Sequence, residues 1–100
     1  MSSEIELNAA AARGARAEAL LRNELLTDAF ATLEQAYIAK WRTTTVDDVA
    51  AREKLFLAVN IVGKVQDHLA SVVEDGKLAA AELRQITEAA ERQKAWHEVR

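Results

Sequence analysis

The sequence predicts an all-α fold: a long antiparallel helical hairpin plus a C-terminal helix, oligomerising as a helical bundle. Three observations predict this fold class. The 100 residues include no proline and only three glycines, which suits long uninterrupted helices. Large apolar residues recur at spacings of three and four, which is the period of one helix face. A single short polar turn, Thr43–Thr45, separates the two strongest stripes.

We expect one helical domain over residues 1–100, in three parts. Residues 1–22 form an alanine-rich N-terminal helix or arm, residues 23–76 the hairpin core, and residues 77–100 a C-terminal helix or tail. Half of the residues are hydrophobic, but many of these are alanine, so the core should be thin. Small chains with thin cores often gain stability by association. We therefore predict a homo-oligomer.

The N-terminal part has high helix propensity but few large side chains to bury. Ser2 or Ser3 can cap its first turn. The part is either a frayed arm or a helix that docks closely on a neighbouring subunit. Asn23 is a good N-cap and a mediocre interior residue, so it predicts a kink and the start of a new helix.

The first arm of the hairpin carries a clear amphipathic stripe. Its apolar positions are Leu26, Phe30, Leu33, Tyr37 and Trp41. Three β-branched polar residues at Thr43–Thr45 disfavour further helix and supply hydroxyls for capping. A connection this short places the flanking helices antiparallel. Tyr37 and Trp41 should therefore lie near Val49–Phe56.

The second arm is the predicted central helix. Thr45 is its expected N-cap, in a capping box with Asp48, and Gly76 is its expected end, because glycine suits the left-handed conformation just past a helix. Further apolar residues widen its stripe beyond half of the circumference, so we expect contact from at least two sides. Gly63 costs about 1 kcal/mol in a helix interior and predicts close approach of another helix. The core positions of this arm are Leu55, Val59, Val62, Leu69 and Val73.

The C-terminal part predicts a third helix from Leu78 to Val99 with a weaker apolar stripe. Trp96 stands in a polar surrounding, so this part is either a solvated helix or a docking peptide with Trp96 as its anchor. Trp41 either closes the core at the hairpin end or faces a partner together with Arg42, since tryptophan and arginine are enriched at interface hot spots. The interface candidates are Trp41, Arg42, Gly63 and Trp96.

Composition narrows the function classes. No cysteine is present, which excludes disulfides and thiolate metal sites. No apolar run approaches the ~18 residues of a membrane span, and no secretory signal is visible, so the expected compartment is cytoplasmic and no membrane partner is expected. The net charge is −3 and the pI about 5.4, far from the pI above ~9 of a typical nucleic-acid-binding domain. These values disfavour nucleic acid as a partner, although a symmetric ring can concentrate modest charge.

Catalytic and metal motifs are absent from the sequence. His68 and His97 are the only histidines, and neither has a glutamate three residues earlier, as di-iron bundles require. No nucleophile motif and no glycine-rich phosphate loop occurs. We expect no catalytic residue, no cofactor and no metal, and hence no enzyme.

Three stretches resemble a family of short, mostly uncharacterised helical proteins of tailed bacteriophages and prophages. They are residues 13–21 (RGARAEALL), Glu34–Arg42 with its ending AKWR, and residues 73–79 (VEDGKLA). The resemblance implies a part in particle assembly, either in the head or portal region or in packaging DNA, with other phage structural proteins as partners. It implies the host cytoplasm during assembly, or the virion, as the location. It transfers no functional residue.

The leading hypothesis is a non-enzymatic structural or assembly component of a phage particle, which acts through helix-mediated oligomerisation. One alternative is a small packaging-terminase subunit that binds DNA. The acidic central helix and the lack of an N-terminal DNA-binding unit depart from the pattern of such subunits. A further alternative is a phage-encoded inhibitor of a host protein.

Overall fold

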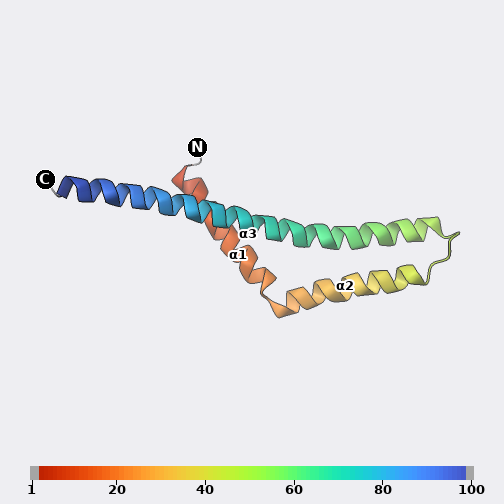
Figure 1. Ribbon diagram of the computed structural model, residues 1–100. Coiled ribbons are helices and arrows are strands. Elements are labelled where there is room, and N and C mark those ends of the chain that lie inside the picture. Colours follow the sequence, from red (N-terminus) through yellow and green to blue (C-terminus); the bar gives the residue numbers. More distant parts are fainter. Residues whose placement is uncertain (1–2, 99–100) are drawn as a thin grey trace. The chain divides into compact units, whose positions relative to one another are not determined.

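The computed structural model describes residues 3–98, which form three α-helices and no strand (Figure 1). α1 spans Glu4–Leu21, α2 spans Glu24–Arg42 and α3 spans Val49–Glu98. The predicted all-α class is confirmed.

Local capping groups set the beginnings of α1 and α2. The Ser3 hydroxyl accepts a hydrogen bond from the backbone N–H of Glu6 at 3.1 Å, so Ser3 caps α1. The side chain of Asn23 accepts one from the N–H of Leu26 at 3.0 Å, with Asn23 in extended conformation. The predicted break at Asn23 is therefore confirmed.

Threonine hydroxyls close the end of α2. The hydroxyl of Thr43 donates to the carbonyl of Lys40 at 2.7 Å, and that of Thr44 donates to the carbonyl of Trp41 at 2.6 Å. These carbonyls belong to the last turn of α2, and they also accept hydrogen bonds from the backbone N–H groups of Thr43 and Thr44, each at 3.1 Å. The predicted stop at Thr43–Thr45 is confirmed, and the connection extends over residues 43–48.

The expected N-cap of the central helix is wrong by three residues. α3 begins at Val49, and the carboxylate of Asp48 accepts from the N–H of Ala51 at 3.3 Å. Thr45 instead offers its backbone carbonyl to the N–H of Asp48, at 3.1 Å, within a turn. Both residues are good N-caps, and the helix uses the one nearer to its apolar stripe.

The expected end of this helix at Gly76 is also wrong. α3 continues through Gly76 to Glu98, so residues 77–98 belong to α3 and do not form a separate helix. Over residues 3–98 no glycine has a positive φ. Glu74 and Lys77 form an exposed ion pair at 3.5 Å across the position of Gly76, as expected for residues three apart in a continuous helix.

Gly76 has a packing role. A β-carbon built on it would lie 2.6 Å from the Cα of Gly14 in α1 and 3.1 Å from the carbonyl oxygen of Ala10. The backbones of α1 and α3 approach so closely that only glycine fits at this level. α1, which is rich in small residues, therefore packs directly against α3 within the same chain.

The chain divides into two compact units. One combines Met1–Glu18 with Ser71–Arg100, and the other is Ala19–Ala70. The first contains the crossing of Gly14 and Gly76, and its buried apolar residues are small or few: Leu7, Ala17, Val73 and Ala79. In the second, only Val62 is a buried apolar residue among those described.

The predicted core is buried only in part. Val62 and Val73 are buried, whereas α2 contains no buried residue at all. The prediction that Leu33 is a core residue is wrong, because 44% of its surface is exposed. Within Ala19–Ala70 the stripe of α2 has a single helix to pack on, which leaves its sides open. The half-buried members of the predicted core are Leu26, Phe30, Tyr37, Leu55, Val59 and Leu69.

Candidate interaction surface

The end of α2 meets the start of α3 at Trp41. The guanidinium carbon of Arg52 lies 5.1 Å from the centroid of the Trp41 ring, within the ~6 Å range of cation–π attraction. This contact places Trp41 next to Arg52 in the first turn of α3. Trp41 is still 43% exposed, so the rest of its surface is available to a partner.

Two shallow apolar hollows lie beside this contact, and they share Phe56. One, of about 260 Å³, is lined by Ile38, Trp41, Leu55, Phe56 and Val59. The other, of about 430 Å³, is lined by Val46, Val49, Arg52, Glu53 and Phe56. Their linings are mainly apolar, which suits apolar side chains of a protein partner better than a polar substrate. The loop-end patch, as we name it, consists of Ile38, Trp41, Val46, Val49 and Phe56.

A second apolar surface follows the outside of α3. Leu57, Ile61 and Val65 are spaced by four residues and therefore lie on one side of the helix. Leu57 is 58% exposed, Ile61 59% and Val65 44%. We name these three residues the outer ridge.

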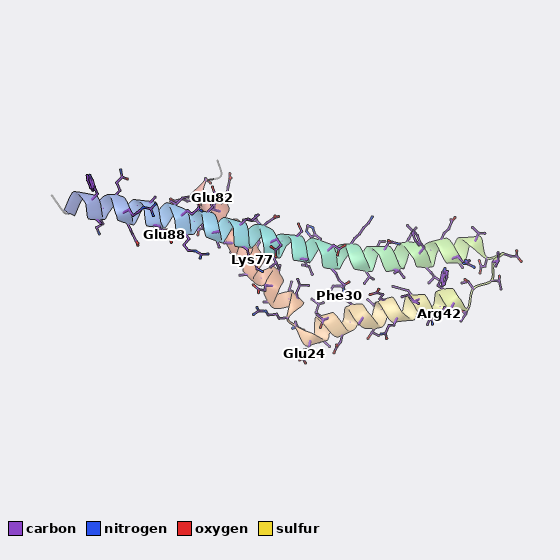
Figure 2. The ribbon with its side chains drawn as sticks, in the orientation of Figure 1. Glu24, Phe30, Arg42, Lys77, Glu82 and Glu88 are labelled. Carbon is purple, nitrogen blue, oxygen red and sulfur yellow. The ribbon has the colours of Figure 1, made fainter. Side chains whose placement is uncertain are left out.

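The outer ridge differs from the face of α3 that packs on α2. Leu55 and Val59 of α3 line a hollow together with Ile38 and Trp41 of α2. Leu57 follows Leu55 by two residues, and residues two apart in a helix point to different sides. Figure 2 shows Phe30 of α2 in the space between α2 and α3, and it shows further side chains projecting from the side of α3 turned away from α2.

The predicted interface residues lie in different elements and units of the chain. Arg42 is exposed beside Trp41 at the end of α2, whereas Gly63 lies within α3. A β-carbon built on Gly63 would have no atom of the described residues within 4 Å, once its two chain neighbours and the nearby backbone of α3 are left out. Among the described residues of Ala19–Ala70 no helix therefore approaches Gly63 closely, and approach by a second chain stays a prediction. Trp96, in the other unit, is 71% exposed.

The structure adds two features that sequence reasoning missed. Arg52 was not assigned to the ring of Trp41, although its place near the start of α3 is within reach of a short connection. Leu57 was not recognised as part of an exposed face, although the spacing of Leu57, Ile61 and Val65 is regular in the sequence. Ile61 and Val65 widen the apolar stripe of the predicted central helix, but together with Leu57 they form a separate exposed face.

No group of three or more histidine, cysteine, aspartate or glutamate side chains within the described part of the chain could hold a metal ion. His68 is exposed, and the side chain of His97 lies outside the described residues. None of the helices in residues 3–98 has the length and apolarity needed to cross a membrane.

Comparison with family models, with curated proteins and with solved structures finds no match for this chain.

Proposed function

We propose that this chain is a non-enzymatic assembly protein of a tailed-phage particle, which acts in the head or portal region through helix-mediated oligomerisation. The phage context rests on the resemblance of residues 13–21, 34–42 and 73–79 to that family. The proposal that the chain oligomerises through its helices rests on the apolar side chains that these helices expose.

One observation supports assembly above the others. Large apolar side chains are mostly outside: fifteen are exposed among those described, whereas the buried apolar set comprises Leu7, Ala17, Val62, Val73 and Ala79. Scattered apolar residues on a surface are ordinary, but contiguous ones mark interaction sites. The loop-end patch and the outer ridge are contiguous in this sense, and both lie in Ala19–Ala70.

The hairpin of α2 and the first part of α3 is the proposed building block. Arg52 over Trp41 joins the two helices next to the connection, and the half-buried stripe residues continue the contact. A rigid hairpin presents the outer ridge on a helix, where side chains are held more firmly than on a loop. Trp41, Arg42, Gly63 and Trp96 remain the residues proposed to meet partners.

Two measurements test this proposal. Sedimentation of the purified chain at increasing concentration should show a discrete species larger than a monomer. Mass spectrometry of purified particles and of assembly intermediates should detect the chain in at least one of them. A chain that remains monomeric at high micromolar concentration would overturn the oligomeric mode of action, and its absence from every particle form would overturn the phage role.

A further inference from the structure

We draw no further inference here: the strongest candidate, the loop-end patch where the end of α2 meets the start of α3, is an exposed apolar surface with Arg52 over Trp41 beside two shallow hollows, but nothing among residues 3–98 shows what covers it.

Discussion

Gly14 and Gly76 face each other across the crossing of α1 and α3. A β-carbon on Gly14 would lie 2.7 Å from the Cα of Gly76 and 3.1 Å from the carbonyl oxygen of Val72. Distances this short involve backbone atoms, which cannot move aside as a flexible side chain can. The two positions therefore depend on each other, although they are far apart in the sequence.

The first prediction compares the three glycines. Gly14→Ala or Gly76→Ala gains about 1 kcal/mol in helix propensity, but it forces the backbones apart, and overpacking commonly costs ~1–3 kcal/mol. We expect each to lower the free energy of unfolding. Gly63→Ala is the matched control: with nothing within 4 Å it should raise this free energy by about 1 kcal/mol. Urea unfolding followed by circular dichroism at fixed protein concentration measures all three.

The sign of the effect is the decisive feature of that experiment. A Gly76→Ala chain that is stabilised as much as Gly63→Ala would contradict the close crossing. Loss of self-association in Gly63→Ala, without loss of helicity, would instead support the prediction that Gly63 meets a second chain.

The second prediction concerns the start of α2. Asn23→Ala removes the side-chain acceptor that binds the N–H of Leu26, so it should lower stability by about 1 kcal/mol. Asn60→Ala is the control, because Asn60 lies inside α3 and its amide donates only to the carbonyl of Phe56 within the same helix. Thermal unfolding should show a lower midpoint for Asn23→Ala and an equal or higher midpoint for Asn60→Ala.

The third prediction distinguishes Asp48 from Thr45 as the N-cap of α3. Asp48→Ala should cost about 1 kcal/mol, because it leaves the N–H of Ala51 without its side-chain acceptor. Thr45→Ala should change stability little, since the observed bond from Asp48 to Thr45 uses the backbone carbonyl. Asp48→Asn should retain most of the stability, because asparagine caps equally well. A larger loss for Thr45→Ala than for Asp48→Ala would favour the capping box expected from the sequence.

The fourth prediction separates an assembly protein from a DNA packager. The N-terminal basic candidates Arg13, Arg16, Arg22, Lys40 and Arg42 stand among acidic residues. We expect duplex binding no tighter than ordinary non-specific levels, ~10⁻⁴ to 10⁻⁶ M at physiological salt. A fluorescence titration of the assembled oligomer with a labelled duplex at two salt concentrations measures this. Nanomolar binding, weakened by Arg13→Ala and Arg16→Ala, would make the small terminase subunit the better interpretation.

Features encoded by neighbouring residues were predictable from the sequence. Asn23 and the hydroxyls of Thr43 and Thr44 act within four residues of themselves, so local capping rules placed both breaks correctly. Gly76 was misread for the opposite reason. Glycine suits a helix end and a close helix crossing equally, and the residue that decides between them, Gly14, lies 62 positions earlier.

The candidate surfaces were predictable only in part. The breadth of the apolar stripe in the central helix predicts contact from at least two sides, and this contact stays a prediction because Leu57, Ile61 and Val65 are exposed. Leu33 and Ile61 are both large and apolar at helical spacing, so their sequence positions alone do not separate a core residue from an exposed one. The exposure of an apolar stripe depends on how many helices pack around it. The sequence of one chain does not state that number of helices.

The connection between α2 and α3 has a practical consequence. Each helix end that it joins is closed by its own adjoining residues, Thr43 and Thr44 on one side and Asp48 on the other. The stretch between these caps can therefore accept an inserted epitope or fluorescent peptide without unwinding either helix. Doubling the length of a flexible loop costs only about 0.6 kcal/mol in closure entropy. An insertion after Val46, which is 81% exposed, would label the chain and, because Val46 belongs to the loop-end patch, would also disturb any association through that patch.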